Sequence, residues 1–526
     1  MEIVRKLCDQ SAMIADAPPS LVTIPTEMVW KICDHLIEDN DKFLADHAHK
    51  PWNPTTNRKT WESTVTHFPA LGNLARTCKH LQRLTEPRLY QSIEICVESP
   101  MAFINIIRRF SRFRSLAAFV KELRITGTGF SVYTGSVEQL YFLLREGLRL
   151  GLRLSPSGRE LHGELESIMI DVLLCQAKAA EAIFIMIPQC DMATYDCSLG
   201  SGELRSDLLY ARRLPNSFAL ESLHHLDVQS PYPNWRGFSP SIAVQKASVR
   251  ALLAHTPALT RLRIGGPFYE EGMLIPRPLP KLRDIQVVHL FDEDIARLAA
   301  LCPQLRRCRF GVDNWVGPQS QLAFANLNLM RDNPEAAPAQ LAKRCLFLAD
   351  WVLERLLPMR RMLEELDMGW CGLVILQMRH LRLLRRFSAL RSLHLGVVRW
   401  PDGDNSELIA QLPPSIEFLC LGGHGMPVVE IAALLVKAIR RGRLPNLKCF
   451  RYTMYRETLQ PGTVERLGEV FGGTGVDYGE KPLPRISPAL EAQMRTQGQS
   501  ETPDWQEEMA EELEDGMVLD SEQSGV

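Results

Sequence analysis

The chain has 526 residues, of which 45% are apolar and 23% charged, and its formal net charge is −2. This length exceeds that of an ordinary single domain, so we expect several domains or one extended array. A nearly neutral charge excludes a basic field over the whole chain, so nothing at this level indicates nucleic acid or a membrane surface as a partner. No stretch has the continuous apolar length that a membrane span requires.

The cysteine pattern indicates reduced thiols. The chain holds 13 cysteines, an odd number, and none are spaced as C-x-x-C. Scattered cysteines of this kind are typical of small buried side chains and not of a disulfide framework or a zinc site. We therefore predict a cytoplasmic or nuclear protein that holds no metal and no cofactor.

The N-terminal part predicts two helices separated by a long loop. Residues 1–20 form a leader that we expect to be disordered, and a helix is predicted to begin near Pro25 and Glu27. Residues 37–67 are polar and carry prolines, which favours a loop. A second helix is predicted to end at Pro87. The apolar residues at helical spacing are Met28, Val29, Ile32 and Leu36 in the first helix and Leu71, Leu74, Cys78, Leu81 and Leu84 in the second.

A recurring pattern follows, in which Leu or Ile is succeeded by apolar residues three and five positions later. In its strict form a proline stands two residues ahead, as at Pro257, Pro280, Pro303, Pro414 and Pro445. Looser copies occur at Val120 to Ile125, Leu165 to Ile170, Leu223 to Val228, Leu363 to Met368 and Leu390 to Leu395. Within two runs of copies the spacing is 23 to 31 residues, and helical patterns precede several of them. One strand and one helix per unit predicts an α/β solenoid with a parallel sheet. Parts of 127–220 and 311–360 remain unassigned.

The C-terminal end is acidic. After Arg495 there is no Lys or Arg, while residues 496–526 hold ten Asp and Glu. Such a composition predicts disorder from about residue 486. An alternative stays open, because Trp505, Met509, Leu513 and Met517 repeat every four residues and would form one face of a helix that docks on a basic surface. The domains we predict are the leader 1–20, a helical domain 21–93 with an inserted loop at 37–67, a solenoid 94–470 and a C-terminal segment 471–526.

Two motifs together resemble a known family. The opening Ile24-Pro25-Thr26-Glu27, the segment from Leu71 to Leu81 and the sequence Pro87-Arg88-Leu89-Tyr90 resemble an F-box of the fungal type. The segment Leu363 to Leu373 matches the leucine-rich-repeat consensus L-x-x-L-x-L-x-x-[NC]-x-L. The chain therefore resembles the F-box/LRR class, which implies an α/β fold with a short N-terminal helical F-box ahead of a leucine-rich-repeat-like solenoid.

This resemblance also implies partners. In the family, the F-box binds the Skp-type adaptor of an SCF (Skp, cullin, F-box) ubiquitin ligase and through it a cullin, and the repeats bind a protein substrate. The residues carried over as the buried and adaptor-facing set are Ile24, Pro25, Met28, Val29, Ile32, Leu36, Leu71, Leu74, Cys78 and Leu81. Two alternatives stay open: these residues form the core of a helical cap that closes the solenoid, or the chain is a protein-interaction scaffold without ligase association.

We find no catalytic motif, so we predict that the chain is not an enzyme. The best glycine-rich stretch, at 472–480, has Glu480 where a phosphate-binding loop needs Lys. Alternate residues of a strand point to opposite faces, which places four arginines on the concave face of the predicted sheet. These are Arg261, Arg263, Arg307 and Arg309, and we predict that they bind an acidic or phosphorylated substrate. The alternative is that they only solvate the exposed face.

Overall fold

The computed structural model describes residues 25–35, 69–96, 100–126, 137–154, 161–186, 211–229, 246–265, 273–287, 292–310, 347–374, 378–401, 403–453 and 462–480. The structural statements below refer to these ranges. The predicted leader, the whole inserted loop at 37–67 and the acidic segment from residue 486 lie outside them.

The described chain is built on one α/β array with a parallel sheet, as predicted. Every strand pair is parallel, and sequence neighbours are spatial neighbours along the path from β1 to β13, with β8 pairing beside β9. The strands are β1 (Ser92–Cys96), β2 (Glu122–Thr126), β3 (Ala182–Met186), β4 (His225–Gln229), β5 (Arg261–Gly265), β6 (Asp284–Val287), β7 (Arg307–Phe310), β8 (Phe347–Leu348), β9 (Glu365–Val374), β10 (Ser392–Arg399), β11 (Phe418–His424), β12 (Cys449–Thr453) and β13 (Asp477–Glu480).

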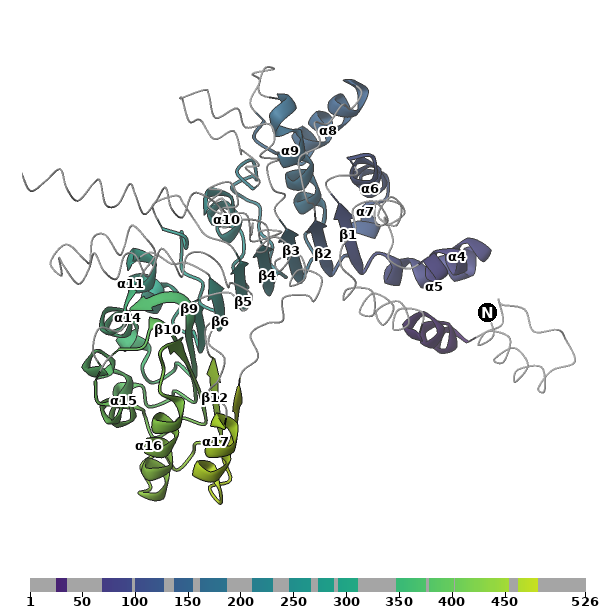
Figure 1. Cartoon of the computed structure of the whole chain (residues 1–526). Coiled ribbons are helices and arrows are strands. Elements are labelled where there is room, and N and C mark those ends of the chain that lie inside the picture. The colour runs from purple at the N-terminus through teal and green to yellow at the C-terminus, as the bar shows by residue number, and fades with distance from the viewer. Residues whose placement is uncertain are drawn as a thin grey trace, which may run out of the picture.

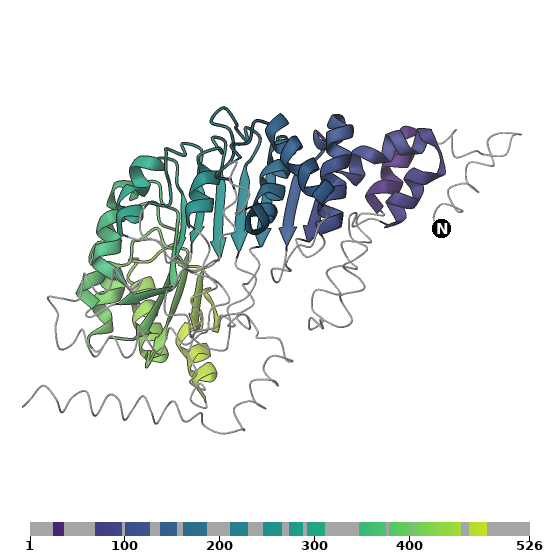
Figure 2. The ribbon, with the colours of Figure 1, turned by 90° about the horizontal axis from the view of Figure 1, so that it is seen from above.

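Helices cover one side of this sheet, and the sheet curves away from them, which leaves a concave face on its other side (Figure 1; Figure 2). A helix at 26–35 precedes the array. The others are α4 (Pro69–Thr77), α5 (Lys79–Leu89), α6 (Pro100–Arg112), α7 (Arg114–Ala117), α8 (Val137–Arg149), α9 (Leu161–Gln176), α10 (Lys246–Leu253), α11 (Asp292–Leu301), α14 (Ala349–Leu356), α15 (Asn405–Gln411), α16 (Val428–Arg440) and α17 (Thr463–Phe471), with short 3₁₀ turns η3 (Leu357–Met359), η4 (Met378–Leu381) and η5 (Leu384–Arg386).

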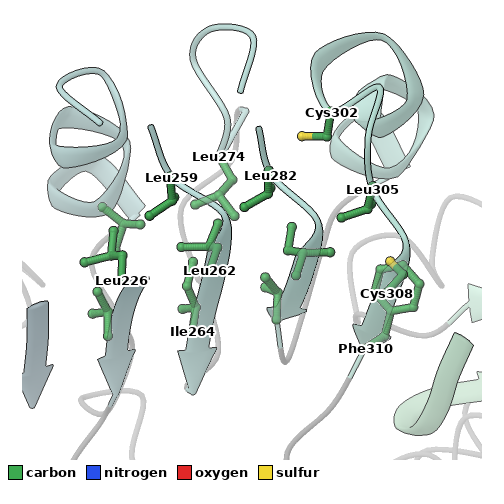
Figure 3. Packing of buried hydrophobic residues seen from close by; sticks show 14 of the residues in the cluster. Leu226, Leu259, Leu262, Ile264, Leu274, Leu282, Cys302, Leu305, Cys308 and Phe310 are labelled. Carbon is green, nitrogen blue, oxygen red and sulfur yellow. The ribbon is translucent and has the colours of Figure 1, made fainter. Parts of the chain in front are cut away.

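One apolar row runs through the centre of the array. Leu262 of β5 is in register with Leu226 on one side and Ile285 on the other, and all three are fully buried. Figure 3 shows these side chains pointing into the layer between sheet and helices. The complete row, strand by strand, is Ile93, Leu123, Ile183, Leu226, Leu262, Ile285, Cys308, Leu366, Leu393, Leu419, Phe450 and Tyr478. The sheet therefore keeps one register from end to end.

Backbone hydrogen bonds hold this register where each strand begins. The carbonyl of His224 accepts from the N–H groups of Thr260 and Arg261, and the carbonyl of Thr260 accepts from those of Arg283 and Asp284. The same double acceptance recurs from Gln91 to Glu417, and the carbonyl of Lys448 accepts from the N–H of Asp477. Because each unit repeats this bond pattern, its strand cannot slip by one residue without losing both bonds.

The strand predictions were correct with one exception. All five proline-led copies and four of the looser ones coincide with strands. The segment Leu165 to Ile170 was predicted as a strand and lies in α9. This prediction was wrong because α9 is apolar on almost every side, with Ile168, Met169 and Ile170 all buried. In such a segment a strand-like spacing arises without a strand.

The second predicted helix is two helices. The chain breaks at Cys78, whose side chain accepts from the backbone N–H of Leu81 and caps α5. We predicted that the helix ends at Pro87, and this was wrong. Pro87 lies inside the last turn of α5. A proline there lacks the N–H that would donate to the carbonyl of Arg83, so α5 has one helical hydrogen bond fewer near its end.

The sheet extends past the predicted solenoid range. It begins at Ser92 and ends at Glu480, so β13 takes in residues that we assigned to the C-terminal segment. The glycine-rich stretch predicted as a turn does turn, with Gly473 and Gly475 at φ of 75° and 72°, and β13 follows directly.

The stretches of chain that follow the carboxyl ends of the strands differ in length. The stretches between described ranges that follow the carboxyl ends of β1 to β7 range from 3 residues (97–99) to 36 residues (311–346). The residues just ahead of β4 to β7 carry the register bonds.

We predict that Leu262→Ala lowers the free energy of unfolding by about 2–5 kcal/mol, because a fully buried side chain in the central row leaves a cavity. Urea titration followed by circular dichroism measures it. Arg283→Ala, an exposed change beside β6, is the control and should stay within about 0.5 kcal/mol. Equal effects would contradict the central row as the source of stability.

Candidate functional site

The N-terminal helices form one packed unit in spite of the long stretch between them. Val29 and Cys33 of the helix at 26–35 are buried in the same cluster as Leu81 of α5. Arg88 of α5 lies 3.2 Å from Asp34 (Nη2 to Oδ1). Burial, followed by the nearby Asp34 charge, raises the pKa of Cys33 to about 11. This thiol is therefore neutral and serves as core.

The predicted adaptor-binding residues divide into buried and accessible ones. Val29, Ile32 and Leu81 are buried, so they hold the unit together and present no surface. Leu74, Cys78 and Met28 are half-buried and Pro25 is exposed. Leu71 lies in α4 but its side chain is outside the described set, as are Ile24 and Leu36 altogether.

Our sequence analysis missed Trp30. Its side chain is 47% exposed on the helix at 26–35, the largest accessible apolar group of this unit. Trp30 is out of phase with the buried Val29 and Ile32, and the search for a single apolar face therefore passed over it. The sequence signal that could have identified Trp30 as a surface residue is a large aromatic side chain outside the buried phase of the helix.

This helical unit is fixed to the first strand of the array. The Arg109 guanidinium of α6 lies 5.2 Å from the ring centroid of Tyr90, which follows α5 directly, and 3.5 Å from Glu86. The rings of Tyr90 and Phe110 are 5.9 Å apart. These contacts set the orientation of α5 relative to β1.

The four predicted arginines are brought together on the concave face. Arg261 and Arg307 lie in register on either side of Asp284, and Arg263 and Arg309 lie on either side of Gln286. In this register the arginines of β5 and those of β7 lie two strands apart on the same face of the sheet.

Carboxylates accompany these arginines. Asp284 Oδ2 lies 3.4 Å from Arg261 Nε and 3.7 Å from Arg307 Nη1. Glu365 Oε1 accepts a 2.7 Å hydrogen bond from Arg309 Nε. Asp227 Oδ2 lies 3.8 Å from Arg263 Nη1. An anionic ligand would therefore compete with acids already in place.

Arg309 has the most buried side chain of the four arginines. Desolvation alone lowers the pKa of its guanidinium, but the hydrogen bond to Glu365 and the charges of Asp284 and Asp367 outweigh it and raise the pKa. Arg309 is therefore held as a cation with its charge balanced locally, whereas Arg261 and Arg307 keep about half of their side-chain surface exposed.

A second polar cluster adjoins the arginines, on β9 to β11. Asp367, His394 and Cys420 occupy the same register position on three neighbouring strands. His394 Nδ1 lies 2.9 Å from Asp367 Oδ1. Burial alone lowers the pKa of His394, but the contacts with Asp367 and Cys420 raise it to about 9. His394 is thus an imidazolium at neutral pH and adds a buried positive charge to the concave face.

This cluster does not offer an accessible nucleophile. Cys420 is fully buried, so a substrate does not reach its sulfur in this conformation. Within the described ranges, no three His, Cys, Asp or Glu side chains are grouped as metal ligands, and none of the helices there has the length and apolar character to cross a membrane. The concave face is suited to recognition of polar groups.

A scan of protein-family models gives no match to this chain, and no curated protein matches it.

We predict that the charge of His394 stabilises the fold. Its folded-state pKa is raised from 6.5 to about 9, so the contribution is complete below pH 6.5 and is lost as pH rises through 9. The difference in unfolding free energy between the wild type and His394→Gln should shrink over that window by an amount on the order of 3 kcal/mol. Urea titrations from pH 6 to 10 measure it. A difference that stays constant with pH would show that His394 is neutral throughout.

Proposed function

We propose that the chain is the substrate-recognition subunit of an SCF-type ubiquitin ligase. The N-terminal helices would form an F-box that binds a Skp-type adaptor and through it a cullin, and the array, as a leucine-rich-repeat-like solenoid, would bind a protein substrate. Such a protein acts in the cytoplasm or nucleus. The supporting observation is the packed unit of the helix at 26–35 with α4 and α5, placed directly ahead of β1.

The geometry fits a receptor because it joins two surfaces rigidly. Tyr90, Glu86 and Arg109 connect the helical unit to the array, so a ligand on the concave face would be held at a fixed position relative to the adaptor. A ligase needs this fixed spacing, because the substrate lysine must reach the ubiquitin-loaded enzyme.

An alternative, a helical cap on a scaffold, is favoured by the burial of Val29 and Ile32, since a cap requires only core contacts. Trp30 distinguishes the two functions. A cap gains nothing from an exposed indole, whereas an adaptor-binding surface would bury it.

We predict that Trp30→Asp lowers recovery of a co-expressed Skp-type adaptor by at least about tenfold, because a carboxylate would be desolvated at the centre of the interface. Pull-down on the full-length chain measures the recovery. Lys31→Gln, an exposed change on the same helix that also alters the charge by −1, is the charge-matched control. Leu36→Asp should act in the same way as Trp30→Asp. Full recovery with folded Trp30→Asp protein would favour the cap.

The concave arginines give a separate prediction. Reversal to Glu would place extra carboxylates beside Asp284, so Arg261→Gln with Arg307→Gln is the better change. We expect this double variant to lose substrates from a proximity-labelling set by about tenfold while adaptor binding is kept, as the loss of charge-assisted bonds implies. Arg283→Gln with Arg306→Gln, in the residues just ahead of β6 and β7, is the control. Unchanged partners would mean that the arginines only solvate the sheet.

A further inference from the structure

The outer side of α8 carries an apolar stripe, made of Val137, Tyr141 and Leu148. Their exposed fractions are 69%, 70% and 63%, the three highest among the large apolar residues of the described ranges. Positions i, i+4 and i+11 lie on one side of a helix. The opposite side is already in use, because Leu143 is fully buried in the core. Helix α8 therefore has an apolar face with no partner among the described residues, and such a patch marks a docking surface.

Polar contacts hold α8 in place beneath this stripe. Gln176 of α9 donates 3.0 Å hydrogen bonds from Nε2 to Glu146 Oε1 and to Ser111 Oγ of α6. Burial alone raises the pKa of Glu146, but the hydrogen bonds from Arg149, Ser111 and Gln176 lower it to about 2. The inner side of α8 is thus fixed by an ionised group, and the helix cannot rotate to bury its stripe without breaking this network.

The surface around the stripe extends onto α6 and is mainly basic, with Glu138 as an exposed acid on the same flank as Arg145. Gln139 Nε2 of α8 lies 2.9 Å from the sulfur of Met101, which is 48% exposed. The guanidinium of Arg108 lies 5.2 Å from the ring centroid of Phe142, and Arg145 is exposed beside the stripe. Helix α6 contains three arginines and no acidic residue. A partner for this surface should therefore combine an apolar stripe with acidic flanks.

One segment of this same chain has that composition. Trp505, Met509, Leu513 and Met517 recur every four residues, and the positions between them include Glu507, Glu508, Glu511, Glu512, Glu514 and Asp515. These residues lie outside the described ranges. As a helix the stripe from 505 to 517 would be about 18 Å long, and the stripe on α8 from 137 to 148 is about 16 Å long. The two stripes match in length and the two flanks are opposite in charge.

The chain is long enough for this contact. Residues 481–504 could span about 80 Å when extended. The path from β13 back to β3, beside which α9 and α8 pack, crosses nine strand spacings, or about 43 Å. The segment therefore reaches α8 of its own molecule without strain.

We propose that residues 505–517 dock as an amphipathic helix on the outer face of α8, with their apolar stripe on Val137, Tyr141 and Leu148 and their acidic flank facing Arg108 and Arg145. The segment folds when it binds, which agrees with the disorder that its composition predicts for the free chain. This contact closes the one helix face of the array whose apolar residues are most exposed.

A second surface competes for the same segment. An open hollow of about 400 Å³ between α16 and α17 is lined by Ala433, Val436 and Val470 and by Lys437, Arg440 and Arg441, with Glu469 also present. It has cations and an apolar floor, but it is a compact hollow with no exposed stripe of matching length. This surface is the alternative that the experiment has to distinguish.

Photo-crosslinking in the full-length protein tests the contact. We would replace Tyr141 with p-benzoylphenylalanine, irradiate, digest with trypsin and identify the partner peptide by mass spectrometry. Because no Lys or Arg follows Arg495, trypsin releases 496–526 as one peptide. We expect this peptide as the main crosslink, within monomers separated by gel filtration. The same probe at Val464 of α17, which is also exposed, is the position control.

Variants make the result specific. Trp505→Ser with Leu513→Ser should lower the crosslink yield at least about tenfold, since two apolar contacts are removed, whereas Gln506→Ser should leave it unchanged. Raising the salt from about 0.05 M to about 0.5 M should also lower the yield, because it screens the acidic and basic flanks. The proposal is overturned if position 141 crosslinks to another segment, to none, or only between two copies, or if the peptide is captured from position 464 instead.

Discussion

The fold depends on the common register of its parallel strands. From β2 to β12 along the main path, each strand is held to the one before it by a pair of backbone bonds to a single carbonyl, and these bonds fix which residues face the helices. A shift of one residue would turn Leu262 outward and would bring Arg261 or Arg263 into the core. The cost of burying an unpaired guanidinium excludes such a shifted register. All other features of the array follow from this constraint.

The same register assembles the concave face. Asp284 meets Arg261 and Arg307 because all three occupy one position on three neighbouring strands, and Asp367 meets His394 for the same reason. Opposite charges on adjacent strands lie within ion-pair distance without any side chain reaching far. The polar face is therefore as well ordered as the apolar one, and its charges are mutually neutralised.

The sequence allowed most strands to be predicted, because a proline and a buried Leu or Ile mark the turn ahead of a strand such as β5. It could not reveal β3, whose residues from Ala182 to Met186 are a plain apolar run, or separate α9 from a strand. Asp284 lies between Arg261 and Arg307 because β5, β6 and β7 are neighbours both in sequence and in the sheet. Glu365 was not predicted as a partner of Arg309, because β7 and β9 are neighbours in the sheet although 54 residues, 311–364, separate them in the sequence. Trp30 was missed because burial phase, and not exposure, guided the search.

The uneven chain lengths after the strands have a consequence for how this molecule can change. Residues just ahead of the strands carry the bonds that keep the register, and the register stays the same although the stretches after the carboxyl ends of β1 to β7 differ in length. Residues can be added or removed at this edge without altering which side chains are buried. The residues ahead of the strands thus determine the register of the fold. The stretches after the carboxyl ends can differ in length, and new contacts can be gained there at a small cost in loop-closure entropy.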